Sequence, residues 1–327
     1  MRLSYRQMRL CDIQPCVDIM SAHPVQRLRY GSSIKLLSPV WSRLLGLESF
    51  RTAVFEAADS DSDPRRSIAL SVSVFVTDDF AQRLKIPPFV WIGPELTVLV
   101  AKERSPLLSD REVAEANSSS GLISLVWAGC VQLEHSKRFE VHNLMVRAFM
   151  EQHCGFRLRE LIAAQAESEE QLQAALGAGA FLFDATCGSY VCSSRQDICK
   201  LHEKPHILGT TRDLVAQQTG TWISELFYDY QEPRFRFNRS QQRLLTAALN
   251  GHTDEQLAEE LSISLATVKT TWRTIYDRVK ESAPEILPTD SSQEERASER
   301  GKTKKYSLLL YLSAHPEELR SIARRTQ

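Results

Sequence analysis

The chain has 327 residues, of which 43% are hydrophobic and 25% are charged, and its formal net charge at pH 7 is −1. This length allows two domains, each with its own core, and the composition is typical of a globular protein. A near-neutral chain does not coat nucleic acid indiscriminately, so only local basic patches remain for such a role.

The sequence contains no apolar run long enough to cross a bilayer, and residues 1–16 lack the apolar core of a signal peptide. We therefore expect a cytoplasmic protein with no membrane partner. Its seven cysteines are irregularly spaced and suggest no disulfide framework, so we expect reduced thiols.

Residues 1–205 are predicted to form a first domain with an α/β (or α+β) fold, in which a mostly β central sheet is flanked by helices. The expected strands are short apolar or alternating runs, at 67–76, 89–91, 96–100, 121–131, 181–183 and 189–192. Run 121–131 is the most apolar, so we place it in the middle of the sheet. The expected helices, with apolar residues every three or four positions, are 12–20, 139–153 and 167–176.

Two parts of this region stand out: residues 9–13 (RLCDI), and residues 153–156 (HCGF) followed by a helix and 179–181 (GAF). The first resembles the first strand-to-helix junction of the GNAT acetyltransferase superfamily, and the second resembles the later half of that fold. The resemblance implies that backbone amides of a glycine-rich loop before a helix would hold the pyrophosphate of acetyl-CoA. The corresponding segment, 132–138 (QLEHSKR), has no glycine. We therefore expect a GNAT-like domain that senses a small-molecule or protein signal, or assembles the protein.

No catalytic residue, cofactor or metal site is predicted. The sequence contains no G-x-S-x-G, P-loop or HExxH motif. Cys192, Cys199, His202 and His206 are residue types that bind zinc, but their spacing matches no zinc motif. We expect them to be ordinary strand or linker residues.

Residues 206–236 are predicted to be a helical linker, with helices at 212–218 and 222–230. The second of these carries an aromatic stripe that is typical of core or interdomain packing. Pro233 then interrupts the chain before a second domain at 237–327.

Three short helices are predicted within residues 238–279. Asn238, Thr253 and Ser264 are suitable N-caps, and the first two are followed three residues later by glutamine, as in a capping box. Only residues 262–264 separate the second and third helices. Two helices joined by such a tight turn form a helix-turn-helix, whose second helix can enter the major groove of DNA.

This stretch resembles the LuxR/FixJ-type helix-turn-helix family, at Gly251, 257–258 (LA), 267–269 (TVK) and 275–276 (IY). The resemblance implies a bacterial, nucleoid-associated transcription regulator with a recognition helix beginning near Ser264. It places the base-reading positions on Lys269, Thr270 and Arg273. The sequence departs from the family where the first helix begins with 237–241 (FNRSQ), and where Thr271 replaces a frequent histidine.

Cations and hydroxyl groups on the exposed face of the third helix suit contacts to phosphates and to guanine. We expect the hydroxyls of Thr267 and Thr274 to donate to phosphates. The predicted DNA-binding residues are Ser264, Thr267, Lys269, Thr270, Thr271, Arg273, Thr274 and Arg278. Residues 296–327 add eight Lys or Arg against three Glu, a balance of +5.

The end of the chain is expected to form an inserted loop at 283–300 and a helix at 304–315. The family resemblance implies a fourth helix that forms much of the dimer contact, and we assign 304–315 to it; a detached tail helix is the alternative. We therefore expect a homodimer on double-stranded DNA. The rival functions are a GNAT-family acyltransferase with an appended helical domain, and a protein-interaction module that has lost DNA binding.

Overall fold

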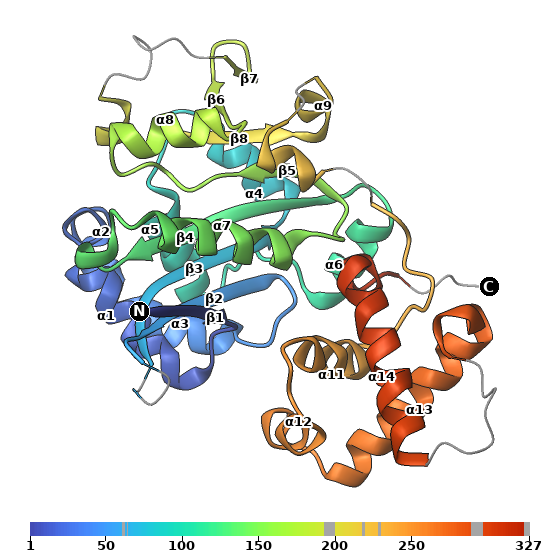
Figure 1. The fold of residues 1–327 in the computed structure, drawn as a ribbon. Coiled ribbons are helices and arrows are strands. Elements are labelled where there is room, and N and C mark those ends of the chain that lie inside the picture. Colours follow the sequence, from blue (N-terminus) through green and yellow to red (C-terminus); the bar gives the residue numbers. More distant parts are fainter. Residues whose placement is uncertain are drawn as a thin grey trace. The chain divides into compact units, whose positions relative to one another are not determined.

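The computed structural model describes residues 1–60, 63, 65–192, 200–217, 220–227, 230–288 and 297–323, with side chains omitted at 297–302 (Figure 1). The chain divides into two compact units. Unit 1 comprises Met1–His153 and Arg157–Tyr228, and unit 2 comprises Cys154–Phe156 and Asp229–Gln327. The division thus falls at residue 228, within the stretch that we predicted as a linker.

Unit 1 has an α/β fold built on an eight-stranded mixed sheet, whose order in the described chain is β1-β2-β3-β4-β5-β8-β6-β7. The pair β4–β5 is parallel and the other pairs are antiparallel. The strands are β1 Arg2–Arg6, β2 Phe50–Ala58, β3 Arg66–Val76, β4 Leu122–Val131, β5 Leu158–Ile162, β6 Phe181–Asp184, β7 Ser189–Val191 and β8 Leu208–Thr211.

Helices cover both faces of this sheet (Figure 1). Helix α7 packs Val141 and Ala148 against Phe55 of β2, whereas α1, α3 and α5 pack against the opposite face, where Val72 lies. The helices of unit 1 are α1 Ile13–Ala22, α2 Pro24–Tyr30, α3 Leu37–Leu44, α4 Asp78–Leu84, α5 Ile92–Ala101, α6 Asp110–Ser118, α7 Phe139–His153, α8 Glu169–Gly177, α9 Arg212–Val215 and α10 Trp222–Glu225, with 3-10 turns η1 Leu10–Asp12, η2 Gly31–Leu36, η3 Leu133–His135 and η4 Leu201–Glu203.

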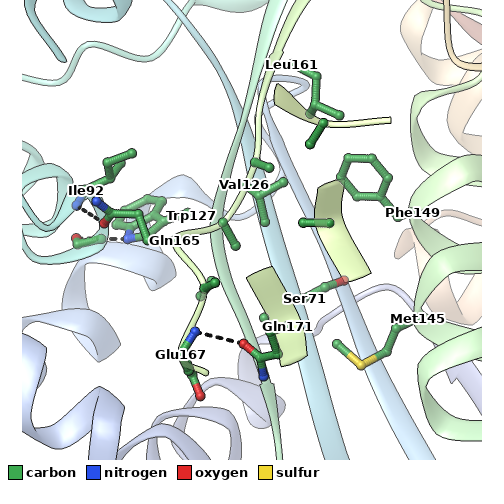
Figure 2. A pocket seen from close by; sticks show the side chains of 18 of the residues that line it. Ser71, Ile92, Val126, Trp127, Met145, Phe149, Leu161, Gln165, Glu167 and Gln171 are labelled. Atoms are coloured by element: carbon green, nitrogen blue, oxygen red, sulfur yellow. Dashed lines mark hydrogen bonds between the residues drawn. The ribbon is translucent and has the colours of Figure 1, made fainter. Parts of the chain in front are cut away.

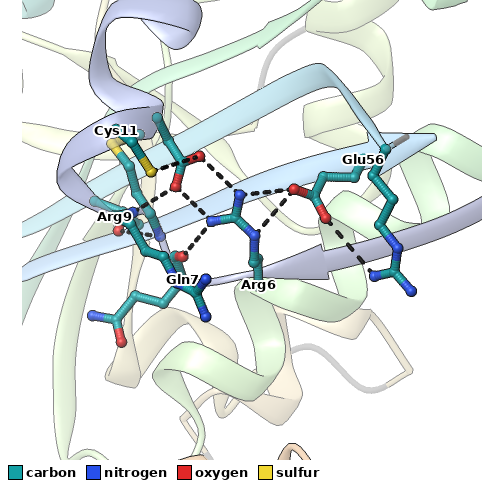
Figure 3. A network of polar contacts seen from close by, with 9 residues as sticks. Arg6, Gln7, Arg9, Cys11 and Glu56 are labelled. Atoms are coloured by element: carbon teal, nitrogen blue, oxygen red, sulfur yellow. Dashed lines mark hydrogen bonds and ion pairs between the residues drawn. The ribbon is translucent and has the colours of Figure 1, made fainter. Parts of the chain in front are cut away.

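A polar network joins β1, β2 and the start of α1 (Figure 3). Arg6 donates from Nη2 to Asp12 Oδ1 at 2.8 Å and from Nε to Glu56 Oε1 at 3.0 Å. Burial alone would raise the pKa of Asp12, but the hydrogen bonds from Arg6 and from the Arg9 amide lower it below the ordinary value. Asp12 is therefore an ion-pair partner, and its side chain does not cap α1.

The most apolar predicted strand is confirmed: β4 is the fourth of the eight strands and is largely buried. The predicted strands near 67–76, 181–183 and 189–192 and the helices near 12–20, 139–153 and 167–176 are also present.

Three predictions were wrong. Residues 96–100 lie in α5, where Ile92, Leu96 and Val100 recur every four positions and are buried, so this apolar run has a helical period. Residues 89–91 precede that helix and form no strand. The linker at 206–236 is not all helical, because Leu208–Thr211 is strand β8, inserted between β5 and β6. The two helices predicted within it are present in shorter form as α9 and α10.

The elements assigned within the described part of unit 2 are helical: α11 Arg239–Leu249, α12 Asp254–Leu261, α13 Leu265–Ser282 and α14 Ala297–Ala314, with η5 Pro284–Ile286 and η6 Pro316–Leu319. The expected loop at 283–300 is thus shorter at both ends, and residues 289–296 lie outside the described part. The caps are as predicted. Asn238 and Thr253 each form a capping box with the glutamine three residues later, and Ser264 accepts from the Thr267 amide.

These helices share one core. Apolar side chains of α11, α12 and α13 pack together, and two leucines of α14 complete the cluster. The buried members from the four helices are Leu244, Leu245, Ala247, Ala248, Leu257, Val268, Trp272, Ile275, Val279, Leu308 and Leu312. Because helices this short are marginal alone, this shared burial is what holds them in place.

Candidate functional site

Helix α13 has a buried face and an exposed face. Val268, Trp272 and Ile275 lie in the core of unit 2, as their spacing predicted. Lys269 and Arg273 lie one turn apart on the exposed face. Within the described part of the chain, neither cation forms a hydrogen bond or an ion pair, so both remain available to an anionic or polar partner.

The hydroxyl groups predicted to contact DNA are engaged within unit 2. Thr270 donates to Ala266 O at 3.0 Å, and Thr271 donates to Thr267 O at 2.9 Å. Thr274 donates to Thr271 O and accepts from Gln241 Nε2 at 3.2 Å. The hydroxyl hydrogens of Thr270, Thr271 and Thr274 are thus used inside the helix.

Ser264 and Thr267 form the start of α13. The hydroxyl oxygen of Ser264 accepts from the Thr267 amide at 3.0 Å and lies 2.8 Å from the Thr267 hydroxyl. Both side chains are exposed. Their role in the structure is therefore to cap the helix.

Arg278 has a positioning role. Its guanidinium Nη1 donates to Arg236 O at 2.6 Å, in the segment that leads into α11. Arg236 has a φ of +47°, in the left-handed region that is uncommon for a residue with a side chain. The Arg278 side chain thus stabilises this conformation and is directed to the backbone of its own unit.

Three side chains fix the orientation of α13. The indole Nε1 of Trp272 donates to Asp254 Oδ1 at 3.2 Å, and Lys305 Nζ lies 2.9 Å from the same oxygen. The ammonium group also lies 4.9 Å from the centre of the Trp272 ring, a cation–π distance. By composition, Lys305 belongs to the basic segment 296–327, and no local pattern in the sequence links residues 254, 272 and 305, so this cluster was not predicted.

Among the described residues, the terminal basic patch is partly buried. Arg320 is buried and donates from Nε to Cys154 O at 2.9 Å, within unit 2. Lys304 is half-buried. Positions 296, 324 and 325 lie outside the described residues, as do the side chains of 300 and 302. Helix α12, in contrast, exposes Glu255 and Glu259 one turn apart.

Unit 1 contains a cavity of about 350 Å³ between β4 and β5 (Figure 2). The two parallel strands pair only as far as Leu125 and Ile162, whereas β4 continues to Val131 beside β3. Figure 2 shows Val126 and Leu161 in the opening, with Met145 and Phe149 of α7 to one side and Trp127 and Gln165 to the other.

Gln165 keeps the chain after β5 away from β4. Its Oε1 accepts from the Ile92 amide at 2.7 Å, and its Nε2 donates to Val90 O and His206 O, both at 2.9 Å. The Ala166 amide donates to His206 Nε2 at 3.2 Å. The segment after β5 is thereby bonded to the residues before α5 and before β8. Its hydrogen bonds are made there and not to β4, which leaves the gap between β4 and β5.

Arg29 and His206 support the same wall. Arg29 donates to Gln165 O at 2.9 Å and His202 O at 3.0 Å, and its guanidinium lies 3.9 Å from the centre of the Trp91 ring. Burial lowers the pKa of His206, whose Nδ1 lies 2.8 Å from Lys204 O. A neutral ring with the proton on Nδ1 fits both contacts, because Nε2 must accept from Ala166.

The four residues weighed as zinc ligands do not make a site in the described structure. Cys199 lies outside the described residues, and His206 is occupied by backbone contacts. No cluster of three or more metal-binding side chains occurs among the residues that the structure describes. In the same part of the chain, the helices are too short or too polar to span a membrane.

No protein-family model matches the chain, and no curated protein matches it. Among solved structures, one similar chain is an uncharacterized protein from Bacillus halodurans, with 8% sequence identity and a TM-score of 0.38 over 68% of this chain and 90% of that one.

Proposed function

We propose that this protein is a bacterial DNA-binding transcription regulator whose helix α13 enters the major groove. The observation that carries the proposal is a pair of cations, Lys269 and Arg273, that have no partner among the described residues. They lie one turn apart on the exposed face of a helix whose other face is packed in a core. Either side chain is long enough to reach guanine acceptors or a phosphate from such a helix.

The connection between α12 and α13 supports this docking. Ser262, Ile263 and Ser264 form the turn, and Ser262 adopts a φ of +53°, which ends α12 abruptly. A short turn of this kind lets the first helix cross the DNA backbone while the second lies in the groove. The N-terminus of α13, with its partial positive charge, would then point toward phosphates.

A homodimer is part of the proposal. One recognition helix buries too little surface for tight specific binding, and a two-fold dimer on a repeated half-site solves this problem. Helix α14 supports it, because Tyr306 and Leu310 are 69% and 59% exposed and lie one turn apart. Leu308 and Leu312 of the same helix are buried, so α14 is apolar on an outer as well as an inner face.

The alternative of a GNAT-family acyltransferase receives less support. The loop between β4 and α7 would have to offer backbone amides to a pyrophosphate. The amides of His135 and Arg138 instead donate to carbonyls within this loop, at 2.9 and 3.0 Å.

The regulator proposal includes two further parts. Unit 1 senses a signal or assembles the protein, and the protein acts in the cytoplasm, on the nucleoid.

An interaction module without DNA binding is favoured by one observation, the exposed carboxylates of Glu255 and Glu259 on α12. In the proposed docking they would approach phosphates and weaken binding.

The deciding experiment is retention of genomic fragments by the full-length protein as salt is raised. Selective, salt-sensitive retention of a few fragments supports a regulator. Absence of retention at low salt, with and without acetyl-CoA, would contradict it.

A further inference from the structure

The exposed face of α13 carries an acid as well as two cations. Asp277 lies one turn after Arg273, which itself lies one turn after Lys269. An α-helix turns by about 100° per residue, so Asp277 lies about 40° around the helix from Arg273. Trp272 and Ile275 are buried on the opposite side. Asp277 therefore belongs to the surface that is proposed to enter the major groove.

The backbone around Asp277 is held in place by the core of unit 2. Ile275 and Val279, two residues before and two residues after it, are both fully buried. The neighbouring Arg278 donates from Nη1 to Arg236 O at 2.6 Å. These contacts hold this turn of α13 against the core, and position 277 is thereby kept on the exposed side.

The carboxylate of Asp277 is not used inside the protein. Asp277 is exposed, and within the described part of the chain it forms no hydrogen bond or ion pair. Arg273 lies one turn before it, but a cation followed by an acid is the less favourable order for a pair on a helix. The carboxylate is therefore free to accept a hydrogen bond from a partner outside the protein.

On DNA, only some bases can satisfy a carboxylate. The phosphates repel it, so it lowers the affinity unless a base donates to it. In the major groove, guanine presents the acceptors N7 and O6, and thymine presents the acceptor O4. Cytosine presents its N4 amino group as a donor, whereas adenine presents an amino group beside the acceptor N7. Cytosine is thus the base that best pairs with a carboxylate.

The spacing along α13 relates Asp277 to Arg273. A helix rises 1.5 Å per residue, so four residues advance by about 6 Å, and base pairs are about 3.4 Å apart. Asp277 should therefore meet a base about two base pairs beyond the one that Arg273 contacts. A recognition helix that lies along the major groove can read bases over about two turns, which is the distance from Lys269 to Asp277.

We infer that Asp277 is a specificity-determining residue, which selects cytosine about two base pairs from the base that Arg273 contacts. This inference rests on the proposed function and adds a base preference to it. The family resemblance places base reading on Lys269, Thr270 and Arg273 and does not include Asp277.

The test is selection of DNA by the full-length protein from duplexes with a randomised core. The enriched sequences are compared for the wild type, Asp277→Asn, Asp277→Ala and Glu281→Gln. Asparagine has nearly the shape of aspartate, but its amide pairs with N6 and N7 of adenine. Glu281→Gln is the matched control, because it removes another exposed carboxylate of α13, one turn later. Circular dichroism verifies that the variants are folded.

We expect the wild type and Glu281→Gln to enrich cytosine at the same position. Asp277→Asn should change this preference to adenine, and Asp277→Ala should abolish it, with the other enriched positions unchanged. In the selected duplex, replacing this C·G pair by T·A should weaken binding of the wild type by at least about fivefold. The same replacement should weaken binding of Asp277→Ala by less than about twofold.

Three results would overturn the inference and leave the regulator proposal intact. Both Asp277 variants could enrich the same bases as the wild type, or they could bind all sequences more tightly without a change at any one position. The wild type could also enrich guanine or thymine at the expected position. If the wild type enriches no sequence at all, the proposed function fails, and this inference fails with it.

Discussion

The indole Nε1 of Trp272 donates to Asp254 Oδ1 at 3.2 Å, which ties the middle of α13 to the first turn of α12. The same carboxylate pairs with Lys305 of α14. One side chain thus ties α12 to α13 and joins both to α14, the helix that completes their core.

Asp254→Ala should therefore destabilise unit 2. It removes an acceptor for Trp272, the partner of Lys305 and a negative charge at the N-terminus of α12. We expect a loss of about 1–3 kcal/mol in the free energy of unfolding, typical of hydrogen bonds to a charged group. Denaturant unfolding measures this loss. Glu255→Ala, at the exposed neighbouring position, is the control and should cost less than half as much.

Lys269→Ala and Arg273→Ala test the docking of α13. If both side chains reach bases, each variant should weaken specific DNA binding by about 1–3 kcal/mol. Titration of an operator fragment, isolated by the retention experiment, gives the affinities. Lys280→Ala, on an exposed position at the other end of α13, should leave the affinity nearly unchanged. Unaltered binding by both test variants would mean that α13 docks differently.

The double variant Glu255→Gln, Glu259→Gln should bind DNA more tightly than the wild type. The paired carboxylates lie on the helix that is proposed to cross the DNA backbone, where they repel phosphates. Their neutralisation should tighten binding to random-sequence DNA by roughly two- to tenfold at low salt, with the gain disappearing as salt is raised. Glu281→Gln, an exposed acidic position at the end of α13, serves as the comparison. If the double variant and Glu281→Gln bind random-sequence DNA with equal affinity, α12 does not approach the phosphates.

Gly93→Ala should destabilise unit 1, although alanine is the better helix former. The new Cβ would lie 2.2 Å from the Tyr30 hydroxyl and 3.3 Å from Trp127 O. Overpacking of this kind costs about 1–3 kcal/mol. Tyr30→Phe in the same chain should recover part of the loss by removing the hydroxyl, which a double-mutant cycle measures. Gly177→Ala, where nothing lies within 4 Å, should not destabilise.

Because His206 is buried as a neutral ring, we expect the free energy of unfolding to fall in mild acid. Its pKa is lowered mainly by burial, and nearby Arg29 acts in the same direction. The unfolded chain therefore binds more protons, so stability is full above the ordinary pKa of about 6.5 and decreases as the pH falls below it. Each unit by which folding lowers the pKa corresponds to about 1.4 kcal/mol in the free energy of unfolding. Unfolding free energies of the wild type and His206→Gln between pH 7.5 and 4.5 should converge toward the acid end. A constant difference would exclude this role.

Local signals determined a large part of the fold. The capping boxes at Asn238 and Thr253 lie within three residues of their partners, so the starts of α11 and α12 could be predicted from the sequence. The long apolar run of β4 and the amphipathic pattern of α7 are equally local. The exposed face of α13 follows from the same period that buries Val268 and Trp272.

Contacts between distant residues decided the rest. The short apolar run at 96–100 fits a strand or a helix, and packing against the sheet made it α5. Strand β8 has only four residues, and its place depends on pairing with β5 and β6. The roles of Lys305 and Gln165 have no signature along the chain. The local sequence pattern determines which face of a helix or strand a side chain occupies. Only the tertiary structure brings Asp254 to Lys305, or Ile92 and His206 to Gln165, because residues so far apart in the sequence share no repeating pattern.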